Sequence, residues 1–167
     1  IDAEVAENGV TFAQNAAQKA REYCRLSGLP TLADDSGLTV DALGGRPGVH
    51  SARYGGPGAT QAAQWQQLLR EMRAVPWGQR GAQFRCALAL ARPGHPELLT
   101  AQGVCHGMIA LQPRGTGGFG YDPLFYLPEC GVTMAELTPE QKDRISHRGR
   151  AARAIAPQIA ALLARES

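Results

Sequence analysis

Residues 32–56 read LADDSGLTVDALGGRPGVHSARYGG, and this stretch holds the most informative pattern in the chain. The apolar run at 29–33 ends in DDSG at 34–37, which predicts a strand that emerges into a polar loop. Carboxylates at a strand end suit a hard divalent cation or the orientation of a water molecule. An Asx turn or a helix cap is the alternative that the same residues support. Because adjacent side chains of an extended chain point to opposite sides, we expect different roles for Asp34 and Asp35.

The composition is that of a globular protein. With 167 residues and a hydrophobic fraction of 44%, the chain can bury a sizeable core. No apolar run approaches the roughly 20 residues of a membrane span, and a net charge of +2 is too small to indicate a nucleic-acid partner. The cysteines form no CxxC pair, which favours reduced thiols and a cytoplasmic protein. They are Cys24, Cys86, Cys105 and Cys130.

A helix is predicted on the N-terminal side of the quoted stretch. Thr11 and Gln14 have the spacing of a capping box, and the helix should run to about Ser27 and end at Gly28. At 100° per residue Lys19 lies at the border of the apolar arc, from which it can reach a cleft, and Asn15 lies outside the arc. The arc itself consists of Phe12, Ala13, Ala16, Ala17, Ala20, Tyr23 and Cys24.

Helices and strands are also predicted on the C-terminal side. Helices should begin near Thr60, at the TPEQ capping box of 138–141, and near Gly149, with Pro157 kinking or splitting the last one. Alternation at 83–91 predicts a strand, and a second strand or pair should follow at 98–111, while 44–48 must be a turn. Without repeats or linkers, we expect one mixed α/β domain over residues 1–167.

Three further segments carry residues suited to nucleotide chemistry. Glu4 and Glu7 precede the first helix and can complete a magnesium site, although solvated surface acids are the simpler interpretation. The glycine-rich 115–123 segment offers backbone N–H groups to phosphates and two aromatic rings to a base, or it is an ordinary hairpin loop. Lys142 with SHRG at 146–149 suits phosphate or a base carbonyl, or it is the basic end of a helix. No P-loop, HExxH or GxSxG signature is present.

Taken together, these segments resemble the Ham1-like family of inosine/xanthosine triphosphate pyrophosphatases, in its bacterial branch. The matching segments, in the family's order, are TFAQNAAQKA, LADDSGLTVDALGGRPGVHSARYGG, GTGGFGYDPLFYLP and MAELTPEQKDRISHRGRA. The resemblance implies an elongated mixed β-sheet flanked by helices, in two lobes with a central cleft, as in ITPase and Maf proteins. It implies hydrolysis of ITP, dITP or XTP to the monophosphate and pyrophosphate, with Mg²⁺, by a homodimer. A Maf-type pyrophosphatase acting on modified pyrimidines fits SHRG and GFGYDP less well.

The resemblance also assigns roles to single residues. Asp35 matches the catalytic acid that activates water, and Glu7, Asp35 and Asp34 match the metal site. Lys19 matches the helix lysine that contacts the triphosphate. The remaining substrate contacts implied are Ser36, Phe119, Gly120, Tyr121, Asp122, Lys142, His147 and Arg148. A donor such as Arg148 facing the C6 carbonyl of hypoxanthine or xanthine would reject adenine, which presents an amino group there.

Two features depart from the family pattern. The family opens with a strand and an (S/T)xNxxK loop that grips the triphosphate, and nothing before Glu7 resembles them, so we expect that the true N-terminus is absent from this chain. The alternative function is therefore a catalytically impaired nucleotide-binding or dimerisation protein. The family also has Glu where this chain has Gln14, which still satisfies a capping box.

Overall fold

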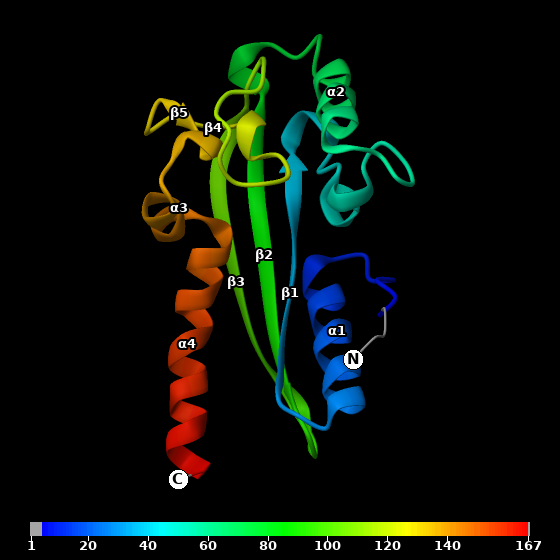
Figure 1. Cartoon of the computed structure of the whole chain (residues 1–167), viewed down its shortest axis with the longest axis vertical. Coiled ribbons are helices and arrows are strands. Elements are labelled where there is room, and N and C mark those ends of the chain that lie inside the picture. The colour runs from blue at the N-terminus through cyan, green and yellow to red at the C-terminus, as the bar shows by residue number, and fades with distance from the viewer. Residues whose placement is uncertain (1–4, 167) are drawn as a thin grey trace. The chain divides into compact units, whose positions relative to one another are not determined.

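The computed structural model describes residues 5–166, in which a five-stranded sheet is flanked by helices (Figure 1). The helices are α1 (Phe12–Ser27), α2 (Gln61–Glu71), α3 (Pro139–Ile145) and α4 (His147–Glu166). The strands are β1 (Thr31–Val40), β2 (Gly81–Arg92), β3 (His95–Ile109), β4 (Phe125–Leu127) and β5 (Val132–Thr133), in the order β1-β2-β3-β4-β5. The pairs β3–β4 and β4–β5 are antiparallel. The predicted α/β class is confirmed.

The chain folds into two compact units. The first comprises the described chain up to Ser36, residues 85–104 and the chain from Ser146 onward; the second comprises 37–84 and 105–145. No helix within residues 5–166 is long and apolar enough to cross a membrane. Glu4, considered above as a metal ligand, lies outside the described residues.

Helix α1 begins and ends where the sequence signals predict. The Thr11 hydroxyl accepts from the Gln14 N–H, and Gly28 closes the helix in the left-handed conformation. Gln14 departs slightly from the expected box, because its Oε1 accepts from the N–H of Val10, one residue before the cap. The helix is thus fixed at both ends by local hydrogen bonds.

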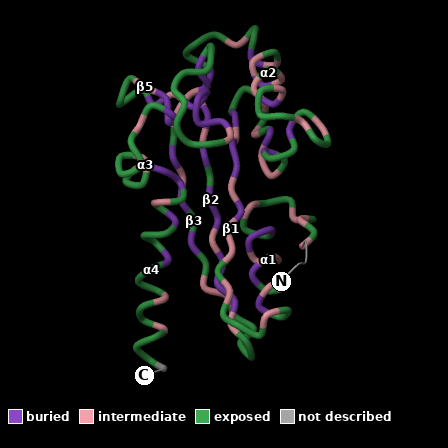
Figure 2. The backbone as a smooth tube through the Cα atoms, viewed as in Figure 1, coloured by how far each residue is buried: buried purple, intermediate pink, exposed green. Residues whose placement is uncertain are grey.

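In the first unit, α1 and α4 pack on opposite faces of the sheet. Alanines at every second position of β2 (Ala87, Ala89, Ala91) contact the α1 face made of Ala16, Ala20 and Cys24. Leu90 points the other way and packs with Ala101 of β3 and Ile155 of α4. This two-sided burial explains why the alternation of 83–91 is lost from Cys86 onward, where every residue to Ala91 is buried except Leu88, which is partly buried (Figure 2).

The second unit has a larger apolar core around stacked rings of Phe84 and Phe125, whose centroids are 4.2 Å apart. Arg80 is an unusual buried residue of this unit, since a charged residue here is only 2% exposed. Its guanidinium donates to the carbonyls of Met72, Val75, Ile109 and Ala110 at 2.7–3.3 Å. These bonds satisfy backbone acceptors just after α2 and at the end of β3.

The predicted loop at 34–37 is wrong, because β1 continues through it to Val40. The strand persists because its polar side chains find partners on both faces. Asp35 is bonded by α1, and Asp34 is bonded by Arg148 of α4. From the sequence alone a polar run predicts a loop, because the partners that satisfy it within a strand are distant in the sequence.

The last helix also differs from expectation. It begins at His147, two residues earlier than predicted, and Pro157 lies inside it without splitting it. Pro157 is exposed, so water can bond the carbonyl that the missing N–H leaves free. Near its start the helix lies very close to β3: a Cβ added at Gly103 would lie 2.0 Å from the His147 carbonyl oxygen and 2.5 Å from the Ala151 nitrogen. The absence of a side chain at Gly103 therefore sets how closely α4 approaches.

Candidate active site

Asp35 is the centre of a polar network on the α1 side of β1. The residue is 8% exposed, and each of its carboxylate oxygens accepts a hydrogen bond from a side chain of α1. Nδ2 of Asn15 donates to Oδ2 over 3.1 Å, and Nζ of Lys19 donates to Oδ1 over 2.9 Å. Asn15 and Lys19 are one helical turn apart, so a single face of α1 presents both donors. A buried carboxylate held this way is pre-oriented for chemistry.

Lys19 joins Asp35 to Glu7. The same Nζ lies 2.9 Å from Oε1 of Glu7 and 2.9 Å from Oδ1 of Asp35. Burial acts to lower the pKa of Lys19, but hydrogen bonds and charges from Asp35 and Glu7 outweigh it, so the pKa is raised above its ordinary value. Two carboxylates therefore converge on one cation.

This pair of carboxylates fits a magnesium site. Within residues 5–166 no three Cys, His, Asp or Glu side chains form a group that could hold a metal ion. Mg²⁺ in nucleotide enzymes, however, is commonly bound by one or two carboxylates, with waters and substrate phosphates completing its shell. Glu7 and Asp35 provide hard oxygen donors of that kind. Asp34 as a third ligand stays a prediction.

Asp34 faces the other side of the strand. Its Oδ2 accepts from Nε of Arg148 at 3.0 Å and from the Ser36 hydroxyl at 3.0 Å. The buried thiol of Cys86 lies next to this group; burial is the main cause of its raised pKa, and a hydrogen bond from Ser36 partly offsets it. The expectation that the two aspartates face different ways is thus confirmed.

The remaining candidate residue of the first unit is His147. It is the first residue of α4 and is buried, with Arg148 exposed beside it. Its backbone carbonyl is the group that Gly103 allows close to β3. The start of α4 therefore holds His147 and Arg148 on the unit that carries Asp34 and Asp35.

In the second unit, Asp122 organises the predicted base-binding residues. It is 2% exposed, and its Oδ2 accepts from the N–H of Phe119 at 2.8 Å and from Lys142 at 2.5 Å. The ammonium of Lys142 also lies 4.7 Å from the centre of the Phe119 ring. A ring that is 59% exposed and held by a cation and a backbone bond is suited to stacking on a flat ligand.

Gly120 and Tyr121 have structural partners in the same unit. The Gly120 carbonyl accepts from Trp65 at 2.8 Å and Gln61 at 2.9 Å, both on α2. Tyr121 is buried, and its hydroxyl donates to the Ser51 carbonyl at 2.9 Å, while burial raises the pKa of the phenol. Of the two rings expected to stack on a base, only Phe119 is exposed.

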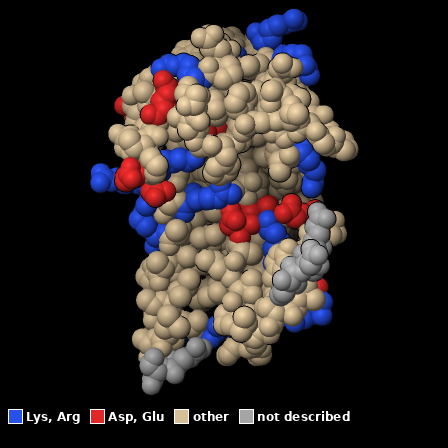
Figure 3. All heavy atoms as spheres, viewed as in Figure 1, with Lys and Arg blue, Asp and Glu red and all other residues tan. Residues whose placement is uncertain are grey.

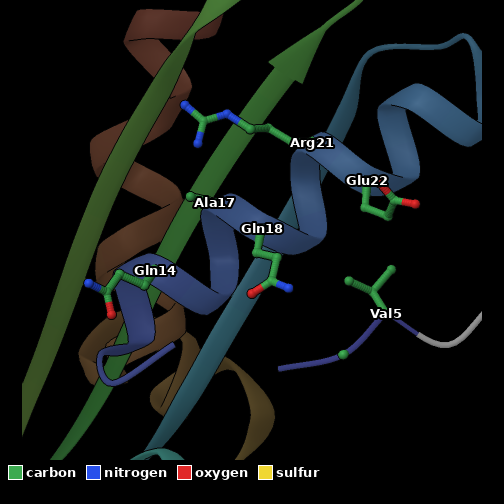
Figure 4. Close-up of a pocket in the computed structure, with 7 residues that line it drawn as sticks. Val5, Gln14, Ala17, Gln18, Arg21 and Glu22 are labelled. Atoms are coloured by element: carbon green, nitrogen blue, oxygen red, sulfur yellow. The ribbon is translucent and has the colours of Figure 1, made fainter. Parts of the chain in front are cut away.

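A cavity of about 580 Å³ lies elsewhere on α1 (Figure 4). It is lined by Val5, Ala6, Gln14, Ala17, Gln18, Arg21 and Glu22. None of the candidate catalytic or binding residues lines it, so we assign it no part in the site. Figure 3 shows basic and acidic groups beside one another rather than one large field of a single sign.

Sequence reasoning missed Asn15. The apolar arc of α1 excluded it, yet its side chain is 1% exposed and bonds Asp35. Its spacing of four residues before Lys19 was the available signal, because residues i and i+4 of a helix share a face.

Comparisons with known proteins identify the family. The Ham1 family matches residues 1–158. The dITP/XTP pyrophosphatase of Geobacillus kaustophilus is 59% identical over 148 residues, covering 89% of this chain and 72% of that protein. The Escherichia coli (strain K12) protein of the same name is 51% identical over 146 residues, covering 87% and 74%. A HAM1 protein structure from Coxiella burnetii has a TM-score of 0.89 at 45% identity, covering 95% of this chain and 81% of that one.

The chain belongs to the Ham1 family. The segments that carried the resemblance, from the α1 residues to the start of α4, lie within the matched range.

Proposed function

We propose that this chain hydrolyses non-standard purine nucleoside triphosphates, namely dITP, ITP and XTP, to the monophosphate and pyrophosphate, and so cleanses the nucleotide pool. Its relatives named dITP/XTP pyrophosphatase support a hydrolase acting on acid anhydrides. The observation that carries the proposal is the convergence of two carboxylates, Glu7 and Asp35, on the ammonium of Lys19. Its Nζ lies 2.9 Å from an oxygen of each. Homodimer formation remains part of the proposal.

In this reaction Asp35 accepts a proton from water. The water oxygen forms a bond to the α-phosphorus as the bond from that phosphorus to the bridging α–β oxygen breaks, and pyrophosphate leaves. Glu7 and Asp35 would hold Mg²⁺, which neutralises phosphate charge and polarises the reacting phosphoryl group. Lys19 adds a positive charge beside the same carboxylates.

Two groups of residues carry the proposed base recognition: Phe119, Asp122 and Lys142 on the second unit, and Arg148 with Asp34 on the first. Phe119 offers its exposed face to the purine, and Asp122 and Lys142 hold that ring in place. Arg148 donates to the C6 carbonyl of hypoxanthine or xanthine, where the amino group of adenine would meet donor against donor. Asp34 holds the guanidinium, and the Ser36 hydroxyl donates to the same Oδ2 of Asp34.

The test is pyrophosphate release from ITP, XTP, ATP and GTP with and without Mg²⁺. We expect release from ITP and XTP only when Mg²⁺ is present, and at least 100-fold less from ATP, on the order that a buried donor mismatch produces. Asp35→Asn should abolish turnover, whereas Asp41→Asn, an exposed carboxylate on the turn after β1, should not. Equal rates for Asp35→Asn and wild type would overturn the assignment of the base.

A further inference from the structure

Asn15 is a buried amide at the start of α1, where a polar side chain has to be satisfied completely. It is 1% exposed, and both ends of its amide are bonded. Oδ1 accepts from the N–H of Gly9 at 2.7 Å, and Nδ2 donates to Oδ2 of Asp35 at 3.1 Å. The side chain therefore ties two separate segments to the helix.

These partners fix the orientation of the amide. Gly9 offers a donor, and the carboxylate of Asp35 accepts, so only one of the two amide orientations satisfies both. The flipped amide would direct oxygen against oxygen at Asp35 and leave the Gly9 N–H facing an NH₂ group. Asn15 thus presents a donor to Asp35 in a direction determined by the backbone at Gly9.

The Gly9 side of the contact leaves no room for a side chain. A Cβ at Gly9 would lie 2.6 Å from Oδ1 of Asn15 and 2.7 Å from Cβ of Gln14. Gly9 is two residues after Glu7, so the bond to Asn15 also anchors the segment that carries the second carboxylate. Asn15 and Lys19 hold both Glu7 and Asp35 against α1.

We infer that Asn15 is the positioning residue that keeps Asp35 in its reactive orientation, an inference that rests on the proposed function. Lys19 also bonds Asp35, but its ammonium is attracted to the triphosphate, which carries roughly four negative charges. A neutral amide has no such competitor. Asn15 therefore holds Oδ2 throughout the reaction, while the contact of Lys19 with Oδ1 gives way to substrate.

Steady-state kinetics with ITP test this inference. Asn15→Leu, which has a similar volume and no donor, should lower kcat about 10- to 100-fold and change KM less than about threefold, because misplacing a reacting group costs rate rather than binding. Gly9→Ala perturbs the same amide from its other end and should lower kcat in the same direction. If Asn15→Leu does not fold, Gly9→Ala carries the test.

Gln64→Leu is the matched control. Gln64 is another buried amide, 9% exposed, which donates to the Ala52 carbonyl in the second unit. Its loss should leave kcat unchanged at temperatures where the protein is folded. A fall in kcat for Gln64→Leu as deep as for Asn15→Leu, or wild-type kcat in both Asn15→Leu and Gly9→Ala, would overturn the inference.

A signal that does not depend on turnover separates the two proposals. In nuclear magnetic resonance spectra of the ligand-free protein, the Nδ2 protons of Asn15 should shift in Asp35→Ala and stay in place in Asp34→Ala. An inactive wild type with this pattern would remove the proposed function and leave the Asn15–Asp35 bond standing. An unshifted signal in Asp35→Ala would remove the inference, whatever the activity.

Discussion

Arg148 donates from Nε to Oδ2 of Asp34 over 3.0 Å, and this bond connects the start of α4 to β1 across 114 positions of sequence. Both side chains are about two-fifths exposed, at 44% and 41%. An ion pair this exposed contributes little to stability, so its main effect is to position the guanidinium of Arg148. Asp34 and its neighbour Asp35 thereby serve different partners on opposite faces of one strand.

We predict that Asp34→Asn weakens base recognition and spares the chemical step. KM for ITP should rise several-fold while kcat changes less than threefold, on the order expected for loss of uniform binding. The free energy of unfolding should change by less than about 1 kcal/mol. Steady-state kinetics and urea denaturation check both values. A loss of kcat as deep as that of Asp35→Asn would instead place Asp34 at the metal or the water.

Lys19→Met should raise the affinity of the nucleotide-free protein for a divalent cation. The ammonium occupies the position between Glu7 and Asp35, so removing it leaves two carboxylates without a counter-ion. Titration calorimetry with Mg²⁺ or Mn²⁺ should show several-fold tighter binding, while ITP turnover falls. Lys142→Met removes a cation from the second unit and should leave metal affinity unchanged. Weaker metal binding by Lys19→Met would argue against a shared cation position.

Arg80→Lys should destabilise the protein by about 2–4 kcal/mol. The substitution keeps the positive charge but cannot reproduce the guanidinium fork that serves four backbone carbonyls in a buried position. Urea denaturation gives the value, and ITP hydrolysis well below the unfolding transition should persist. Arg25→Lys, in an exposed pair with Glu22, should leave the midpoint in place. Equal midpoints for Arg80→Lys and wild type would contradict this account of Arg80.

Tyr54 should make the fold sensitive to alkali. Burial, and then a hydrogen bond and charge from Glu71, raise the pKa of Tyr54 from 10.0 to about 12. Its contribution is fully present below pH 10.0, where the phenol keeps its proton in both states, and is lost as pH rises through about 12. At about 1.4 kcal/mol per pKa unit the loss is at most about 3 kcal/mol.

In Tyr54→Phe the fall in stability between pH 10 and 12 should be smaller than in wild type, each measured relative to its own value at pH 9. The buried phenol of Tyr121 also has a raised pKa and is present in both proteins, so the difference reports Tyr54. Parallel profiles of unfolding free energy against pH would show that Tyr54 does not carry the effect.

Elements with local signals were predictable from the sequence. Thr11 and Gly28 bound α1 as expected, and α2 follows its cap at Thr60. At α3 the reciprocal bonds between Thr138 and Gln141 complete the predicted capping box. Each of these depends on residues within one helical turn, which is the range over which a sequence pattern determines geometry.

Features that depend on distant partners were not predictable. The continuation of β1 through Asp34 and Asp35 requires donors from α1 and α4, and the burial of Asn15 requires the carboxylate of Asp35, twenty positions away. Periodicity counts apolar residues and treats a polar one as exposed, so it cannot recognise a buried amide that is fully bonded. Chemistry-bearing residues are the ones most often of this kind.

Gly103 gives the fold a sequence marker. Because any side chain there would meet the backbone of α4 at His147 and Ala151, a homologous sequence with a larger residue at this position has to hold the start of that helix farther from the strand. His147 and Arg148 would then be displaced along with their backbone. The residue at this one position therefore distinguishes homologous sequences that keep this placement of His147 and Arg148 from those that have changed it.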